Sequence, residues 1–149
     1  MSLFSALSVS ASGMSAQRTR AELLTENLAN AETTRTPEGG PYRRKDAVFA
    51  TDYAVSPFAS VFEAQSSGVD GSGLEGVGVA GIAVDNQEPE KRYLPGHPDA
   101  DAQGYVAFPR MNPAEDMVDL MGAARGYQAN VAAVSAIKDM IQHSIDLFH

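Results

Sequence analysis

The chain has 149 residues, a formal net charge of −8 at pH 7 and no cysteine. This length suits one ordinary domain, and the acidic balance argues against a nucleic-acid partner, because phosphates favour a basic surface. The lack of cysteine excludes disulfide bonds and thiolate metal sites. No stretch approaches the roughly 20 apolar residues of a membrane-spanning helix, so we expect no direct membrane span.

Residues 2–30 are predicted to form a helix that is weak on its own. Apolar residues recur with a 3.5-residue period, which is typical of a helix that packs against another helix. Residues 5–16 (SALSVSASGMSA) are nearly all small. In a helix interior, each serine or glycine lowers helix stability by up to about 1 kcal/mol relative to alanine. We therefore expect this helix to become ordered when neighbours surround it.

The middle of the chain is predicted to be a loop-rich β module. Proline and glycine in residues 32–41 cannot continue the first helix. Short apolar or alternating runs then predict strands at residues 47–53, 57–64, 77–85 and 104–108, joined as hairpins with long loops. The basic residues 43–45 are expected at a solvated loop edge. The chain is thus divided into residues 1–33, 34–112 and 113–149.

The motifs of the middle region do not favour catalysis or a cofactor. The glycines of residues 71–76 spell G-x-G-x-x-G, but the strand before them and the helix after them that a dinucleotide site needs are missing. His97, Asp99 and Asp101 could hold a divalent metal, yet they are explained more simply by a turn whose carboxylates bind backbone amides. No nucleophile, base and orienting group come together in the sequence. We therefore expect no enzyme, no metal and no cofactor.

The last third of the chain, residues 113–148, is predicted to be the longest helix. Asn112 can cap it and Pro113 suits its first turn. Gly122 and Gly126 indicate close contact with another helix. A helix of this length is about 50 Å long and needs a partner helix, from this chain or from another. The apolar seam occupies two heptad positions, namely Met117, Ala124, Val131, Lys138 and Ile145, and Leu120, Tyr127, Val134, Ile141 and Phe148.

Several motifs of the chain resemble those of bacterial flagellar rod and hook proteins. Residues 12–17 read S-G-M-S-A-Q, Arg20 follows, residues 27–30 read N-L-A-N, and residues 125–130 read R-G-Y-Q-A-N. The middle segments TTRTPEGGPYRRKDAVF and LPGHPDADAQGYVAFP are similar to those of proximal-rod members of the family.

The resemblance implies an α+β fold, in which long N- and C-terminal helices pair as an antiparallel coiled coil beside a small β-hairpin module. It implies a structural subunit that polymerises into the flagellar proximal rod. Such subunits leave the cytoplasm unfolded through the flagellar type III export apparatus and stay in the periplasm. The N-terminus lacks the basic start of a cleaved signal peptide, which agrees with that route.

The resemblance also implies partners and an assembly interface. The partners are copies of the chain itself, other rod proteins of the FlgB, FlgF and FlgG types, a rod-base adaptor of the FliE type, and the export apparatus. Asn27 and Asn30 either make polar contacts that fix register or cap their own helix. The alternative to a rod subunit is a cytoplasmic coiled-coil adaptor. The expected interface comprises Leu3, Leu7, Met14, Gln17, Leu24, Asn27, Leu28, Asn30, Met117, Leu120, Ala124, Tyr127, Asn130, Val131, Val134, Ile141 and Ile145.

Overall fold

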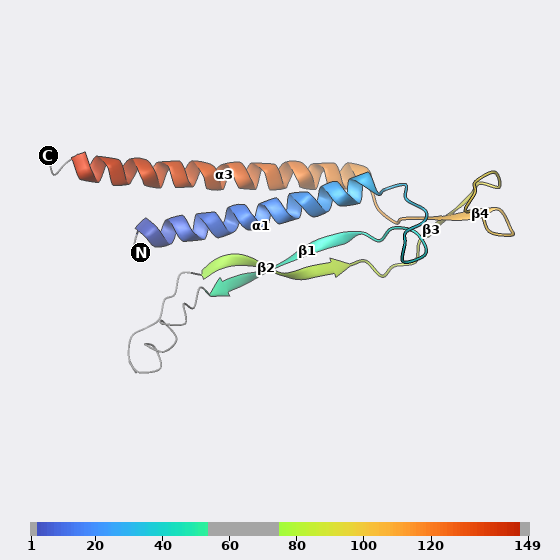
Figure 1. Cartoon of the computed structure of the whole chain (residues 1–149). Coiled ribbons are helices and arrows are strands. Elements are labelled where there is room, and N and C mark those ends of the chain that lie inside the picture. The colour runs from blue at the N-terminus through green and yellow to red at the C-terminus, as the bar shows by residue number, and fades with distance from the viewer. Residues whose placement is uncertain (1–2, 54–74, 147–149) are drawn as a thin grey trace, which may run out of the picture.

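The computed structural model describes residues 3–53 and 75–146. Its elements form an elongated molecule (Figure 1) of the predicted α+β class, with two long helices and two β-hairpins. The strand predicted at residues 57–64 lies outside the described residues. The elements are α1 (Leu3–Ala29), β1 (Lys45–Tyr53), β2 (Glu75–Val84), β3 (Glu90–Tyr93), β4 (Tyr105–Phe108) and α3 (Pro113–Asp146).

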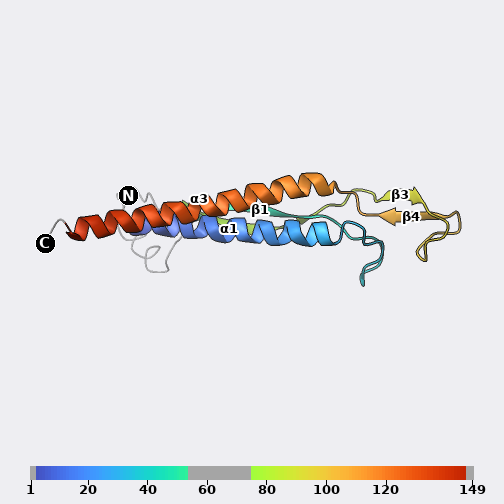
Figure 2. The same ribbon diagram turned by 90° about the horizontal axis from the view of Figure 1, so that it is seen from above.

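The two helices run antiparallel along most of their length, as predicted (Figures 1 and 2). The N- and C-termini consequently lie at the same end of the molecule. Asn112 caps α3 as expected, because its Oδ1 accepts a hydrogen bond of 3.1 Å from the Ala114 amide.

Helix α1 is the middle layer of the molecule. It has α3 on one side and the β1–β2 hairpin on the other (Figure 1). Its buried residues therefore point in more than one direction, and they include Ala16, Leu23, Leu24 and Asn27. A helix of small and polar residues is stabilised here by packing on two sides, because its own propensity is weak.

Three of the nine described residues of the predicted α3 seam are half-buried as expected, and the other six are exposed. Leu120, Val134 and Ile141 are half-buried, as expected. The fully buried positions, however, are Asp116, Ala123 and Ile137. The corresponding predicted residues are exposed, namely Met117, Ala124, Val131, Lys138 and Ile145, as is Tyr127. Phe148 lies outside the described residues.

This difference has a physical reason. A heptad count follows apolar residues, whereas the side of α3 that faces α1 includes the polar residues Asp116 and Asn130, which such a count assigns to solvent. The side that faces α1 is set by contacts distant in sequence. A Cβ atom on Gly13 would lie 3.0 Å from Nδ2 and Oδ1 of Asn130, and a Cβ on Gly126 would lie 3.2 Å from Cδ of Gln17. The two helices therefore interlock where the S-G-M-S-A-Q and R-G-Y-Q-A-N motifs meet.

Within the chain, close helix contact at the paired glycines is found at Gly126 and not at Gly122, whose contact with another subunit stays a prediction. A Cβ on Gly122 would meet nothing within 4 Å, and the residue is exposed. Asn130 completes the contact by donating from Nδ2 to the Gly126 carbonyl oxygen at 2.9 Å, within its own helix. The side chain is thereby held over Gly13.

Strands β1 and β2 form an antiparallel hairpin beside α1. Lys45 pairs with Val84 and Tyr53 with Glu75, with an irregularity between Val48 and Phe49. Both strands were predicted, and each begins two residues earlier than expected. The hairpin is tied to α1 by Ser12, whose Oγ accepts a hydrogen bond of 3.1 Å from the Val77 amide.

Strands β3 and β4 form a second hairpin at the end of the molecule away from the termini (Figure 2). Strand β4 was predicted, but β3 was missed, because EKRY is exposed throughout and lacks apolar alternation. Gly104 closes the loop with φ +85°, and a Cβ there would lie 2.9 Å from Cε2 of Tyr93. Glycine alone adopts such a conformation without strain. None of the described helices is long and apolar enough to span a membrane.

We predict that Gly13→Leu weakens helix pairing. The added side chain would collide with Asn130, and overpacking of this kind costs about 1–3 kcal/mol. Gly122→Leu is the matched control, because the space there is open and leucine favours a helix over glycine by about 0.5–1 kcal/mol. Urea unfolding should show opposite changes in the free energy of unfolding for the two variants. Equal changes of the same sign would contradict the interlocked contact.

Candidate functional site

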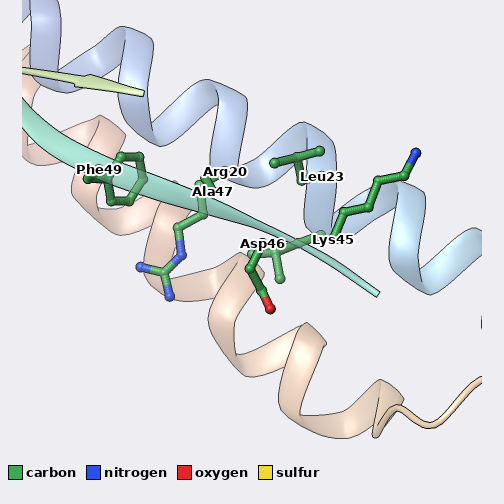
Figure 3. A pocket seen from close by; sticks show the side chains of 7 residues that line it. Arg20, Leu23, Lys45, Asp46, Ala47 and Phe49 are labelled. Atoms are coloured by element: carbon green, nitrogen blue, oxygen red, sulfur yellow. The ribbon is translucent and has the colours of Figure 1, made fainter. Parts of the chain in front are cut away.

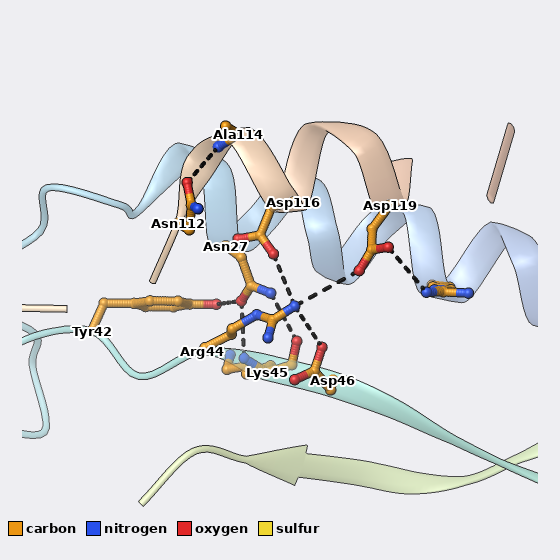
Figure 4. A network of polar contacts seen from close by, with 10 residues as sticks. Asn27, Tyr42, Arg44, Lys45, Asp46, Asn112, Ala114, Asp116 and Asp119 are labelled. Atoms are coloured by element: carbon orange, nitrogen blue, oxygen red, sulfur yellow. Dashed lines mark hydrogen bonds and ion pairs between the residues drawn. The ribbon is translucent and has the colours of Figure 1, made fainter. Parts of the chain in front are cut away.

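The junction of α1, α3 and the β1–β2 hairpin is organised around Asn27, which is fully buried (Figure 4). Its Nδ2 donates to the Lys45 carbonyl oxygen at 2.8 Å. Its Oδ1 accepts from the Lys45 amide at 2.9 Å and from the Tyr42 hydroxyl at 3.0 Å. One side chain thus satisfies both backbone groups of the first β1 residue, and it fixes the position of the hairpin along α1.

Asn30 has the capping role that was considered for both asparagines. Its Nδ2 donates to the Glu26 carbonyl oxygen at 2.9 Å, and its Oδ1 accepts from the Thr33 hydroxyl at 3.1 Å. These bonds satisfy groups at the end of α1. Asn30 therefore caps its own helix, whereas Asn27 makes a polar contact that sets register within the chain.

Arg44 connects the hairpin to α3 (Figure 4). Its Nη2 lies 2.9 Å from Oδ1 of Asp116, 3.4 Å from Oδ1 of Asp46 and 3.9 Å from Oδ2 of Asp119. Asp119 also lies 3.6 Å from Nη2 of Arg20, which brings α1 into the cluster. One guanidinium therefore joins carboxylates from β1 and α3.

The expectation that residues 43–45 form a solvated loop edge is wrong for Arg44 and Lys45. The Arg44 side chain is largely covered. Nζ of Lys45 lies 2.6 Å from Oε1 of Glu26 and 5.6 Å from the centre of the Tyr42 ring. Sequence reasoning had no signal for this burial, because Glu26 lies 19 residues from Lys45 and Asp116 lies 72 residues from Arg44.

Asp116 is the buried charge of the site. Its side chain is only 1% exposed, and its Oδ2 has no hydrogen-bond partner. Burial raises the pKa of Asp116; Arg44 opposes this rise, while the nearby carboxylates of Asp46 and Asp119 add to it. The desolvation of the carboxylate thus outweighs the attraction of Arg44.

Tyr42 borders the same junction. It is buried, and burial, followed by the charge of Glu26, raises its pKa to about 12. The hydroxyl therefore keeps its proton at neutral pH and donates it to Asn27. Sequence reasoning did not identify Tyr42, Arg44 and Asp116 as members of this junction.

A small pocket lies between α1 and β1 (Figure 3). Its volume is about 240 Å³. Two of its charged side chains already have partners, because Lys45 pairs with Glu26 and Asp46 pairs with Arg44. The pocket is better described as a gap in helix–strand packing than as a place for chemistry. Its lining consists of Arg20, Leu23, Leu24, Lys45, Asp46, Ala47 and Phe49.

The loop with His97, Asp99 and Asp101 is held as a turn. Oδ1 of Asp101 accepts from the amides of Gln103 and Tyr105 at 2.9 and 2.8 Å, and Nδ1 of His97 accepts from the Asp99 amide at 3.1 Å. Residues 3–53 and 75–146 contain no group of three or more side chains placed to hold a metal ion.

The residues of the expected assembly interface differ in exposure. Leu24 and Asn27 are buried inside the chain. The side chain of Leu3 lies outside the described residues. Contact of any of these residues with another subunit stays a prediction. Half-buried members are Leu7, Met14, Gln17, Leu28, Asn30, Leu120, Asn130, Val134 and Ile141, and exposed members are Met117, Ala124, Tyr127, Val131 and Ile145.

We predict that Asn27→Ala destabilises the folded chain more than Asn30→Ala does. The first variant leaves the buried backbone groups of Lys45 and the Tyr42 hydroxyl without partners, and buried unsatisfied groups cost about 1–3 kcal/mol. The second removes partly exposed bonds worth about 0.5–1.5 kcal/mol. Urea unfolding, together with amide exchange at Lys45, measures both effects. Unchanged exchange at Lys45 in Asn27→Ala would contradict the assigned role.

We predict that ionised Asp116 destabilises the folded chain and that this destabilisation disappears at acidic pH. Its folded pKa lies above the unfolded value, so its ionised form lowers stability at neutral pH, and this cost is relieved as the pH falls through the folded pKa. Asp116→Asn should therefore raise the free energy of unfolding at pH 7. The difference from the unaltered chain should shrink toward about pH 4, where an unperturbed aspartate is about half protonated. Urea titrations across this range test the trend, and a constant difference would contradict it.

Two family models match the two ends of the chain. The model "Flagella basal body rod protein" matches residues 7–35, and "Flagellar basal body rod FlgEFG protein C-terminal" matches residues 102–147. The first covers most of α1 and the second covers β4 and α3. The matched regions thus contain the two motifs that meet at Gly13 and Gly126.

Full-length relatives extend the match through the middle. The flagellar basal-body rod protein FlgC of Bacillus subtilis is 39% identical over 99% of each chain. FlgC of Borreliella burgdorferi is 37% identical over 97% of each chain. FlgC of Salmonella typhimurium is 36% identical over 99% of this chain and 98% of its own.

These matches confirm the predicted resemblance, including the indication from the middle segments of the FlgC type over the FlgB and FlgG types. They favour the rod over the cytoplasmic adaptor that the sequence left open. The chain belongs to the FlgC family of flagellar basal-body rod proteins, and it is a structural subunit of the proximal rod.

Proposed function

We propose that this subunit joins the rod by burying an outer stripe of α3 against neighbouring subunits. The outer stripe is defined as Met117, Met121, Ala124, Tyr127, Val131 and Ile145. Its large residues are 41–55% exposed. Residues at this spacing lie along one side of a helix, beside the seam that faces α1. An apolar stripe left in water by its own chain is typical of an interaction surface.

Helix α1 offers a different kind of surface. Its exposed positions are small or polar, and two of them, Arg18 and Glu22, form an ion pair of 2.9 Å. Its apolar residues are used within the chain, because α1 lies between α3 and the hairpin. The helical surface that supports association is therefore that of α3. Among the α1 residues whose side chains the structure describes, the exposed positions are Ser8, Ala11, Ser15, Arg18, Glu22, Thr25 and Ala29.

The neighbours are taken to be copies of this chain, rod proteins of the FlgB, FlgF and FlgG types, and a base adaptor of the FliE type. Family membership supports contact with rod components in the basal body. The subunit would act as a mechanical part and not as an enzyme. It would reach the periplasm unfolded through the flagellar export apparatus, without a cleaved signal peptide. The weak α1 helix supports this route, because such a helix unfolds easily and becomes stable through packing.

We predict that Val131→Asp prevents incorporation into the rod while leaving the free chain folded. Val131 is 42% exposed in the chain, so its replacement disturbs no internal core, but burial of an unpaired carboxylate between subunits is costly. The measurements are swimming motility and the amount of the chain in isolated basal bodies, with circular dichroism of the free variant.

Ala136→Asp is the matched control. Ala136 is exposed on α3 and lies about 140° around the helix from Val131, at 100° per residue. Val134→Asp is a poorer test, because Val134 is half-buried in the seam with α1 and its loss would disturb the monomer. Normal motility of the Val131→Asp strain would contradict the proposed role of the outer stripe.

A further inference from the structure

The chain carries its sulfur in methionine alone, and three of its methionines are exposed on α3. It has six methionines and no cysteine. Met117, Met121 and Met140 are 52%, 55% and 51% exposed, whereas Met14 and Met111 are half-buried. Oxidation of sulfur follows its exposure. A small oxidant in solution therefore reaches the first three thioethers more readily than the other two.

The three exposed methionines lie on two different sides of α3. Met117 and Met121 are four residues apart, which makes them neighbours on one side of the helix, and both belong to the outer stripe. Met140 lies about 140° around the helix from Met117 and about 100° from Met121, at 100° per residue. Met140 is therefore as exposed as the other two methionines, but it lies outside the outer stripe.

Oxidation of Met117 and Met121 would change the chemical character of the outer stripe. The residues of the stripe are all uncharged, and a methionine in such a surface adapts its flexible thioether to whatever packs against it. Oxidation converts the apolar thioether into a polar sulfoxide, which disrupts interfaces built on methionine. Burial of that sulfoxide between subunits is unfavourable unless a donor meets its oxygen. The folded chain itself is little affected, because both side chains are exposed in it.

We propose that Met117 and Met121 form an oxidation site, at which a small peroxide stops the free subunit from entering the rod. This inference rests on the proposed burial of the outer stripe, and it adds a means of regulating that contact. A subunit that folds outside the cytoplasm is beyond the reducing systems of that compartment. Its exposed thioethers consequently meet oxidants before the stripe is covered by a neighbour.

Hydrogen peroxide supplies the oxygen atom in this step. A lone pair of the thioether sulfur attacks one peroxide oxygen, so that an S–O bond forms as the O–O bond breaks. The departing hydroxide takes the proton of the transferred hydroxyl group and leaves as water. Sulfur loses two electrons and the peroxide gains them, which gives one sulfoxide and one water per methionine. Methionine sulfoxide reductases reverse the oxidation, so the block on assembly is reversible.

Oxidation of the purified, folded chain by hydrogen peroxide tests the accessibility of the site. Tandem mass spectrometry places each added oxygen atom on a single residue. Met117, Met121 and Met140 should gain oxygen before Met14 and Met111 do, and circular dichroism should show that the oxidised chain keeps its helices. Oxidation of Met117 and Met121 no faster than that of Met14 would overturn the inference.

Glutamine at the two positions tests the effect of polarity on assembly without any oxidant. Met117→Gln together with Met121→Gln places polar amide groups on the outer stripe. This double variant should be lost from isolated basal bodies, although circular dichroism shows its free form folded. Met140→Gln is the matched control, because Met140 is equally exposed and lies outside the stripe, and it should be incorporated like the unaltered chain. Normal incorporation of the double variant would overturn the inference.

Peroxide treatment of cells during rod assembly separates oxidation at this site from general damage. Each strain is compared with its own untreated cells, so that any effect of a substitution itself cancels. In the unaltered strain and in a Met140→Leu strain, treatment should lower the amount of the chain in basal bodies. In a strain with Met117→Leu and Met121→Leu, which has no sulfur on the stripe, this loss should be absent. Equal losses in all three strains would count against the oxidation site.

The outcomes also distinguish this inference from the proposed function. If Val131→Asp is excluded from basal bodies while the double glutamine variant is incorporated, the outer stripe is an assembly surface and only the oxidation site is wrong. If Val131→Asp is incorporated as well, both are wrong.

Discussion

The structure depends on α1 being packed on two sides at once. Gly13 and Ala16 leave room for α3 to approach, while Leu23 and Asn27 are buried near the hairpin. A helix this rich in serine and glycine gains little from its own backbone, and an isolated two-stranded hairpin is marginal in water. Neither element would be stable alone, so α1 and the β1–β2 hairpin stabilise each other through Asn27 and Ser12.

The ion pair of Arg44 and Asp116 positions the hairpin relative to α3 more than it stabilises the fold. A buried carboxylate with one unpartnered oxygen is costly, and a buried ion pair often stabilises no better than apolar residues would. Its geometry nevertheless fixes the hairpin relative to α3, as Asn27 fixes it relative to α1. Two polar contacts to neighbouring residues, Arg44 and Lys45, thus hold three layers in one register. Without them, the small and interchangeable apolar residues of α1 would allow the layers to slide.

Sequence reasoning found the elements but not the contacts that orient them. The period of the apolar residues and the capping residues predicted both helices. The alternation of apolar and polar residues predicted β1, β2 and β4. The heptad could not decide whether Met117 or Asp116 faces α1, because a charged residue is assigned to solvent unless its partner is known. That partner, Arg44, lies 72 residues earlier. For Asn27, the sequence allowed register or capping with equal weight, and only the position of Lys45 decides. A pattern along the chain does not show which residues that are distant in sequence contact each other.

The apolar surface that stays exposed after folding is unevenly distributed over the molecule. This distribution explains why the chain is suited to assembly into a rod. The residues of the outer stripe are all uncharged, although the whole chain has a net charge of −8. Net charge keeps free subunits apart, whereas an uncharged stripe allows close lateral packing once they meet. A molecule that leaves such a stripe in water does not complete its own packing within one chain, because its large apolar side chains remain 41–55% exposed.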